Sequence, residues 1–330
     1  MMKQKMIFLA LTVGSLSAAA PALAAEPAGL AIQAAQMGPA DRTALQNAVM
    51  ADRLARPAAY DIVAVAKGCR PDGWMAARTP EPNCSRELRA LGTAGLLPML
   101  SALALDWSPQ GLSTDAVNRA KEERALLVGL LEAVGTLRDT RARGVLHTLW
   151  QQARGRQELL TPLGRQMTVA RATAEALGRL GGALELQALQ QHLRADDPLY
   201  TAAIAGLGVC KRTDAAQLLV SALATAKDDA TQRTIVQAMG AIASSWSWQA
   251  LGRVRAEDGL RVRQRVTDAL LPLLAKTQGE SRERVVQSLQ LADLPDLPAR
   301  LAAVRTSADA TLQHDIDDLL GRVARAHATR

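Results

Sequence analysis

Aromatic residues are scarce in this sequence of 330 residues: they make up 2% of it, and the single phenylalanine, Phe8, lies near the N-terminus. The hydrophobic content is nevertheless 48%, so the core must be built from alanine, leucine and valine. Such residues favour closely packed short helices and provide little material for a β-sandwich. The composition therefore predicts an all-helical protein.

Histidine and cysteine are also few, which limits the chemistry that the sequence can predict. The four histidines are isolated, and no His-x-x-His, His-Glu-x-x-His or mixed Cys/His cluster occurs. A metal site would have to be assembled wholly from distant residues. No base accompanies Cys210, which is expected to be a small, buried, apolar residue. We therefore predict no catalytic residue, no metal and no cofactor.

The other two cysteines, Cys69 and Cys84, lie close together in the sequence and enclose a loop of 14 residues that is rich in proline and glycine. In an exported chain such a pair predicts a disulfide bond. The alternative is two unrelated thiols.

Long apolar runs are absent after the N-terminus. There, Lys3 and Lys5 precede an apolar run over residues 6–16, and Ala22-Leu23-Ala24 has the form of a cleavage site. This pattern predicts a secretory signal peptide over residues 1–24. A membrane anchor is the alternative, but the run is shorter than the ~20 residues that span a bilayer. We expect a periplasmic or secreted protein, cleaved near Ala24, with no transmembrane segment.

A strong excess of either charge is missing too. Removal of residues 1–24 lowers the formal net charge from +7 to +5, with 37 basic against 32 acidic residues. The arginines are scattered over separate predicted helices, which indicates solvated faces rather than a nucleic-acid groove. We expect no nucleic-acid partner.

The chain does contain an internal repeat. Five glycines each follow Ala-Leu or a near copy of it, and each has a leucine eleven residues later; they are Gly92, Gly135, Gly178, Gly208 and Gly240. Their spacings of 43, 43, 30 and 32 residues fit stacked helix pairs. The residue two positions before each glycine is alanine or glycine. These small residues let two helices approach closely, so each unit should be a helix, a tight turn and a second helix.

The clearest copy lies in residues 169–182 and 184–193, where Val-Ala-Arg-Ala-Thr-Ala-Glu-Ala-Leu-Gly-Arg-Leu-Gly-Gly precedes Leu-Glu-Leu-Gln-Ala-Leu-Gln-Gln-His-Leu. It resembles the HEAT-like repeat of the phycobilisome-lyase type. The resemblance covers roughly residues 86–276, with the Gly92 unit and a sixth pair around Leu271 and Pro272 degenerate. It implies a right-handed α-solenoid of about five to six HEAT-like helix pairs with helical caps.

Such a repeat is a packing pattern that many functions share, so the resemblance says little about activity. Deoxyhypusine hydroxylases, which also have HEAT-like repeats, hold a di-iron site with His-Glu pairs, and this chain has none. Phycobilisome lyases act on bilins inside cells, which the predicted signal peptide opposes.

The predicted organisation has four parts. After the signal peptide, residues 25–85 form an N-terminal helical cap with helices at 41–54 and 58–67. Residues 86–276 form the repeat array, interrupted by inserted loops at 106–116 and 151–168 that leave room for a short helix. Residues 277–330 form a C-terminal cap of three short helices.

The second helix of each unit is expected to line the concave side of the solenoid, and its polar positions could hydrogen-bond an extended peptide. These candidate partner-binding residues are Thr148, Gln151, Gln187, Gln191, Arg194, Gln217, Ser221, Gln249 and Arg253. The alternative is a merely soluble helix face. Trp246 and Trp248 are expected to pack against the next unit rather than form an exposed ligand platform.

Together these patterns favour a non-enzymatic scaffold that binds a protein or peptide partner in the cell envelope. The alternative is an exported enzyme or a lyase-like ligand-binding protein that uses the solenoid groove.

Overall fold

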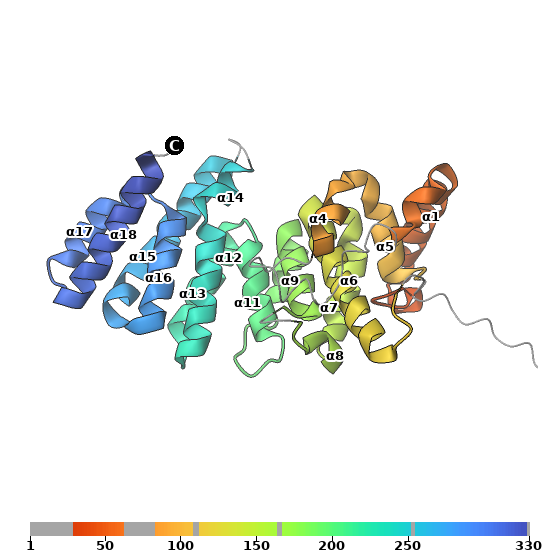
Figure 1. Ribbon diagram of the computed structural model, residues 1–330, viewed down its shortest axis with the longest axis horizontal. Helices are drawn as coiled ribbons and strands as arrows, with labels where there is room; N and C mark the ends of the chain where they lie inside the picture. The colour runs from red at the N-terminus through yellow and green to blue at the C-terminus, as the bar shows by residue number, and fades with distance from the viewer. Residues whose placement is uncertain (1–28, 63–82, 108–111, 164–166, 252–254, 329–330) are drawn as a thin grey trace, which may run out of the picture.

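The computed structural model describes residues 29–62, 83–107, 112–163, 167–251 and 255–328. Their helices stack side by side in one elongated row, with α1 (Pro39–Ala55) at one end and the C-terminal helix at the other (Figure 1). The described residues contain no β-strand beyond a single bridge between Leu163 and Met167. The predicted all-α solenoid is confirmed.

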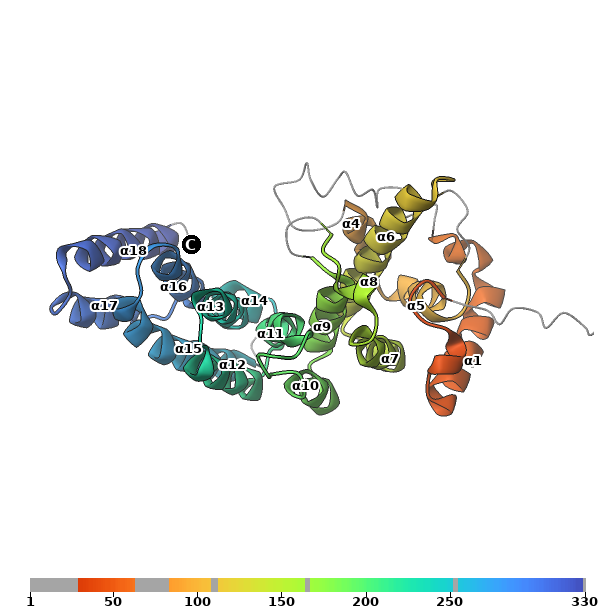
Figure 2. The same cartoon turned by 90° about the horizontal axis from the view of Figure 1, so that it is seen from below.

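The helices form two layers, which are separated most clearly in Figure 2. The inner layer contains α4 (Asn83–Ala90), α6 (Ala116–Leu137), α9 (Val169–Leu180), α11 (Tyr200–Val209), α13 (Asp229–Ala243), α16 (Gly279–Ala292) and α18 (Ala310–Ala328). The outer layer contains α5 (Leu96–Ala104), α7 (Arg143–Ala153), α10 (Ala183–Gln190), α12 (Thr213–Thr225), α15 (Ala256–Lys276) and α17 (Leu297–Arg305). The short helices α8 (Gln157–Leu160) and α14 (Ser245–Gln249) lie between units.

Local sequence signals set the helix ends. The side chains of Asp115, Thr168 and Asp228 each accept a hydrogen bond from a backbone N–H in the first turn of α6, α9 and α13, over 2.8 to 3.0 Å. Such N-caps satisfy donors that have no partner within the helix. Gly181 ends α9 in the left-handed conformation, with φ at +66°. Glycine adopts that conformation without the steric cost that a Cβ brings.

Close contacts between small residues hold the inner layer together. Gly135 lies against Ala176, and Gly208 lies against Ala238, so that a Cβ on either glycine would come within 2.7 or 3.1 Å of the neighbouring helix. Gly178 approaches the carbonyl oxygen of Gly206 even more closely. In each case the glycine of one unit meets the residue two positions before the glycine of the next unit. The repeat register derived from the sequence is therefore confirmed.

The curvature of the solenoid follows from these contacts. Glycine and alanine let the inner-layer helices approach closely. The inner layer is therefore the shorter, concave one (Figure 2). This differs from the expectation that the second helix of each unit lines the concave side, because the small residues lie on the first helices.

The core consists mainly of alanine, leucine and valine, as expected. Trp150 is fully buried, and its indole N–H donates to the carbonyl of Ala188 over 3.2 Å. Cys210 is also buried, and burial raises the pKa of its thiol to about 11. This thiol therefore behaves as a small apolar group, which confirms its expected place in the core.

Two parts of the array differ from the expected organisation. The predicted degenerate pair around Leu271 and Pro272 is a single helix, α15, with Pro272 inside it. The proline lies on the exposed side, where it removes one backbone hydrogen bond without ending the helix. Gly92 adopts a positive φ of +58° at the start of the short 3-10 helix η4 (Gly92–Gly95) and makes no close helix contact, unlike the other repeat glycines.

Some predictions concern residues outside the described ranges. The signal peptide over residues 1–24 and the end of the helix expected at 58–67 belong to this group, and so does Cys69. Cys84 is fully buried on α4. The Cys69–Cys84 bridge therefore stays a prediction. None of the helices in the described ranges is long and apolar enough to span a membrane.

Candidate functional site

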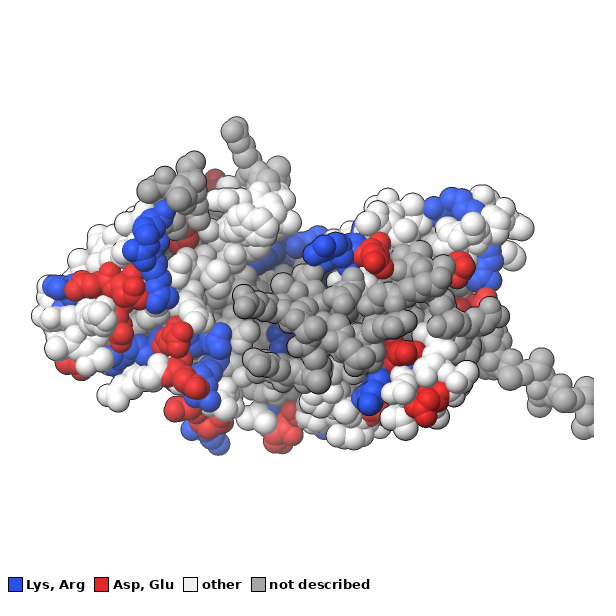
Figure 3. All heavy atoms as spheres, in the orientation of Figure 1, with Lys and Arg blue, Asp and Glu red and all other residues white. Residues whose placement is uncertain are grey.

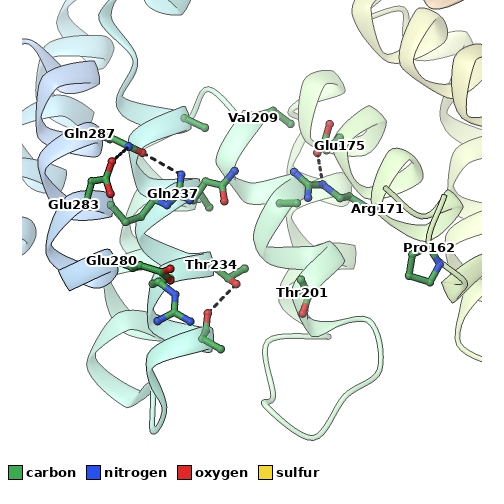
Figure 4. A pocket seen from close by; sticks show the side chains of 16 residues that line it. Pro162, Arg171, Glu175, Thr201, Val209, Thr234, Gln237, Glu280, Glu283 and Gln287 are labelled. Atoms are coloured by element: carbon green, nitrogen blue, oxygen red, sulfur yellow. Dashed lines mark hydrogen bonds and ion pairs between the residues drawn. The ribbon is translucent and has the colours of Figure 1, made fainter. Parts of the chain in front are cut away.

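A groove of about 860 Å³ lies on the concave face, and side chains from four successive inner-layer helices, α9, α11, α13 and α16, line it (Figure 4). Pro162, from the segment before α9, adds to one wall. Arg171 lies on the side of α9, while Glu283 and Gln287 lie on the opposite side, on α16. The groove therefore exists only because the units stack.

Charged residues of both signs line this groove. Three are arginines, Arg171, Arg233 and Arg284, and three are glutamates, Glu175, Glu280 and Glu283. In the space-filling view, basic and acidic side chains likewise alternate over the inner-layer face around α13, α16 and α18 (Figure 3). The groove is thus polar but close to neutral overall.

Arg171 and Glu175 form an ion pair within the groove. The Arg171 Nε donates to Glu175 over 2.9 Å, and Arg179 approaches the other oxygen of the same carboxylate at 3.3 Å. Glu175 is 8% exposed. Both arginines therefore share one carboxylate, and the donors that face Glu175 are already used within the protein.

The other two arginines have only neutral partners. Arg233 donates to the hydroxyl of Ser281 over 3.4 Å, and Arg284 donates to the side-chain oxygen of Gln287 over 3.1 Å. Neither makes an ion pair within the described part of the chain. A guanidinium has five N–H donors, so both retain donors that can meet an anion.

Neutral polar side chains complete the lining. Thr201 and Gln237 are exposed into the groove, from α11 and α13 respectively. Thr234 is partly satisfied, because its hydroxyl donates to the backbone oxygen of Ala230 over 3.0 Å. Amides and hydroxyls of this kind both donate and accept hydrogen bonds, so they suit a polar ligand.

The groove residues share positions in the repeat. Arg171, Thr201 and Arg233 all lie seven positions before the glycine of their unit, and Glu175 and Gln237 lie three positions before it. A spacing of four residues places both positions on one face of a helix. Sequence reasoning missed them because it sought polar positions on the second helices.

The predicted partner-binding residues lie elsewhere, on outer-layer helices or the turns that follow them. Gln151, Gln187, Gln191, Arg194, Gln217, Ser221 and Gln249 are exposed there, and none lines the groove. Thr148 is 8% exposed, and its hydroxyl already donates to Gly144 over 2.8 Å. Arg253 lies outside the described residues. The structure gives no test of whether the exposed members bind a partner.

The two neighbouring tryptophans differ. Trp248 is buried, as predicted, and its indole N–H donates to the carbonyl of Ile242 over 2.7 Å. Trp246 is 78% exposed, so the prediction that it packs against the next unit is wrong. The reason is that α14 has a single turn, which can direct one of the two indoles inward.

A buried lysine close to the groove was also missed. Lys211, just after α11, is 6% exposed, and its Nζ donates to the carbonyls of Ala241 and Ile242 at the end of α13, over 2.9 and 3.2 Å. Burial, together with the nearby charge of Arg138, lowers the pKa of Lys211 to about 7. The amino group thus satisfies two backbone carbonyls at the C-terminal end of α13, in the next unit.

A second buried charge links α7 and α10. Glu185 is fully buried and accepts a hydrogen bond from Arg143 over 2.6 Å, with His147 at 3.6 Å. Burial alone would raise the pKa of Glu185, but the hydrogen bond from Arg143 holds it below its usual value. The described residues contain no group of three or more His, Cys, Asp or Glu side chains placed to hold a metal ion.

No protein-family model matches the chain, and no curated protein matches its sequence. Among solved structures, human deoxyhypusine hydroxylase in complex with glycerol is similar at a TM-score of 0.27 and 13% identity, over 83% of this chain and 99% of that one.

This comparison corrects the predicted function. That solved structure is of an enzyme, so helical-repeat architecture gives no ground for calling this protein non-enzymatic. The scaffold interpretation and the exclusion of catalysis are therefore not retained. This similarity concerns helical repeats alone. It assigns neither a family nor an activity to the chain.

Proposed function

We propose that this protein is a ligand-binding protein whose concave groove holds a polar ligand bearing a carboxylate. The groove is formed by α9, α11, α13 and α16, and it is the feature on which the proposal rests. A ligand-binding protein is among the alternatives that the sequence leaves open, and the groove side chains specify where its ligand would bind.

The observation that carries the proposal is the state of Arg233 and Arg284. Both line the groove, and within the described ranges their side chains hydrogen-bond to neutral groups, those of Ser281 and Gln287, and form no ion pair. A carboxylate could bind either guanidinium through charge-assisted hydrogen bonds without breaking an ion pair. Glu280, also exposed in the groove without an ion-pair partner in the described ranges, could accept a hydrogen bond from a donor on the same ligand.

The test is a thermal-shift screen of the purified protein against a panel of small mono- and dicarboxylates, followed by calorimetry on those that raise the unfolding midpoint. A ligand that binds only the folded state stabilises it by mass action. The double variant Arg233→Gln and Arg284→Gln should lose that stabilisation. Arg261→Gln is the matched control, because Arg261 is exposed on α15 outside the groove and pairs with Asp258. Equal shifts in all three proteins would contradict the proposal.

We also propose that the chain is an exported, HEAT-like repeat protein of the phycobilisome-lyase type, acting in the cell envelope where it would meet a protein or peptide partner. The residue pattern of segment 1–24 and the repeat register support this. Mass spectrometry of protein from the periplasm should show an N-terminus near Ala25 and a Cys69–Cys84 bridge. An intact N-terminus and two free thiols would contradict it.

A further inference from the structure

The exposed indole of Trp246 lies beside a second hollow on the concave face. This hollow has a volume of about 400 Å³, and its apolar wall consists of Trp246, Leu291 and Val323, from α14, α16 and α18. Leu291 is 47% exposed. An exposed indole next to an exposed leucine is an apolar surface that a ligand can remove from water.

The position of Trp246 is fixed by its neighbours. On one side Ser245 donates to Asp293 of α16 over 3.2 Å, and on the other Trp248 is buried and donates to Ile242. Ser247 donates to the carbonyl of Ser244 over 2.8 Å. The single turn of α14 is therefore tied to Ile242 of α13 and to Asp293 at the end of α16, and it directs the indole of Trp246 outward.

This hollow continues into the groove of the proposed function. Gln287 lines both, and it connects Glu283 and Arg284 through hydrogen bonds of 3.1 Å to each. Along α16, Arg284, Gln287 and Leu291 follow one another at intervals of three and four residues, so they share a face. Arg284 and Leu291 are thus separated by seven residues, or about 10 Å along the helix axis.

The geometry points to an amphipathic carboxylate as the ligand of this face: its acid group would meet Arg284, and a planar apolar group about 10 Å farther along α16, at the level of Leu291, would lie in the hollow that Leu291 and Trp246 line. This inference rests on the proposed function, since it uses the same arginine. The inference adds two requirements to the proposed function. The ligand must carry an apolar group for the subsite, and it must be long enough to reach both sites.

The probes are phenyloctanoate, octanoate and phenylacetate, below the concentrations at which such acids form micelles. Phenyloctanoate has a chain long enough to reach both subsites, octanoate lacks the ring, and phenylacetate is too short to span them. Calorimetry should give phenyloctanoate the highest affinity. Its binding should also change the fluorescence of Trp246, which is the exposed indole of the hollow.

Variants of Trp246, Leu184 and Arg284 distinguish the possible outcomes. Trp246→Ala should weaken phenyloctanoate binding about tenfold while leaving phenylacetate unchanged, and Trp246→Phe should restore most of the loss. Leu184→Ala is the control, because Leu184 is 55% exposed on α10 in the other layer. If Trp246→Ala binds phenyloctanoate as the wild type does while Arg284→Gln loses binding, the subsite is wrong and the proposed function stands. If Arg284→Gln binds all three acids unchanged, this inference is wrong, and the double variant Arg233→Gln and Arg284→Gln then decides on the proposed function: unchanged binding by that variant too would show that both are wrong.

Discussion

At the scale of single residues, two buried charges lie at contacts between helices of the array. Lys211 and Glu185 are 6% and 0% exposed, and each lies where one unit meets the next. A buried charge is tolerated only when its hydrogen bonds are made, so removal of a partner costs more than removal of a surface pair.

Lys211 predicts a pH dependence of stability. Its pKa is about 7 in the folded protein against 10.5 for an exposed lysine, so between these values the unfolded chain binds more protons. Stability should therefore rise as the pH increases from 7 to about 9. The measurements stop near pH 9 because Cys210, Tyr60 and Tyr200 have raised pKa values, which lower stability as the pH increases further.

Thermal unfolding of the wild type and Lys211→Met across this range is the measurement. The wild type should show a rising midpoint, and the variant a flatter one, because methionine has no proton to lose. Parallel curves for the two proteins would show that Lys211 does not titrate in this window.

Arg143 predicts a large effect of breaking one ion pair. Arg143→Met leaves the buried Glu185 without its main partner, and the expected loss is about 3 kcal/mol in the free energy of unfolding. Arg141→Met is the control, because Arg141 pairs with the neighbouring Asp139 at the surface, and it should cost less than about 0.5 kcal/mol. Urea unfolding of both variants measures the two losses in the free energy of unfolding. Equal losses would show that the Arg143–Glu185 pair contributes no more than a surface pair.

At the scale of helices, the closest contact is the one between α9 and α11. A methyl group on Gly178 would meet the backbone oxygen of Gly206, which belongs to a helix and has no rotamer by which to move away. Gly178→Ala should therefore lower stability by about 1 to 3 kcal/mol, although alanine favours helices. Gly155→Ala, in a turn with open space around it, should have little effect. A more stable Gly178→Ala protein would contradict this account.

The helices and their register could be predicted because they follow from local patterns. A glycine with alanine two positions earlier recurs along the chain, and caps such as Asp115 and Thr168 precede apolar runs. The concave layer could also have been derived, since close contacts shorten the layer that contains them. The groove then follows from the positions seven and three residues before the glycine, as Arg171 and Glu175 show.

Other parts of the site could not be predicted from the sequence. The pairing of Arg171 with Glu175 and the unpaired state of Arg233 depend on side-chain positions across helices. The different exposure of Trp246 and Trp248 depends on α14 being one turn long and on how Asp293 of α16 meets it. These are contacts between units, and the repeat pattern describes the units themselves.

At the scale of the whole molecule, each unit packs mainly against its two neighbours: α9 contacts α6 and α11, and α13 contacts α11 and α16. Stability in such an array is a sum of terms from units and from the interfaces between neighbours. A local change should therefore have local consequences, unlike in a protein with one shared core.

Hydrogen exchange followed by mass spectrometry tests this locality. In the Gly178→Ala variant, exchange should increase in peptides from α9 and α11 and remain near the wild-type rate in α16 to α18, because opening of one interface does not require opening of the others. A uniform increase along the chain would show a single cooperative unit instead.

The groove gathers its side chains from four successive units, and this gives the molecule an elastic property. When a curved stack of helices bends, the spacing along the inner layer changes, and the distance between Arg171 on α9 and Arg284 on α16 changes with it. A ligand that contacts α13 through Arg233 and α16 through Arg284 would act as a brace that resists this bending. Conversely, a force that straightens the array would move the two walls of the groove apart and release the ligand. The curvature of the whole solenoid would then set the affinity of the groove at its centre.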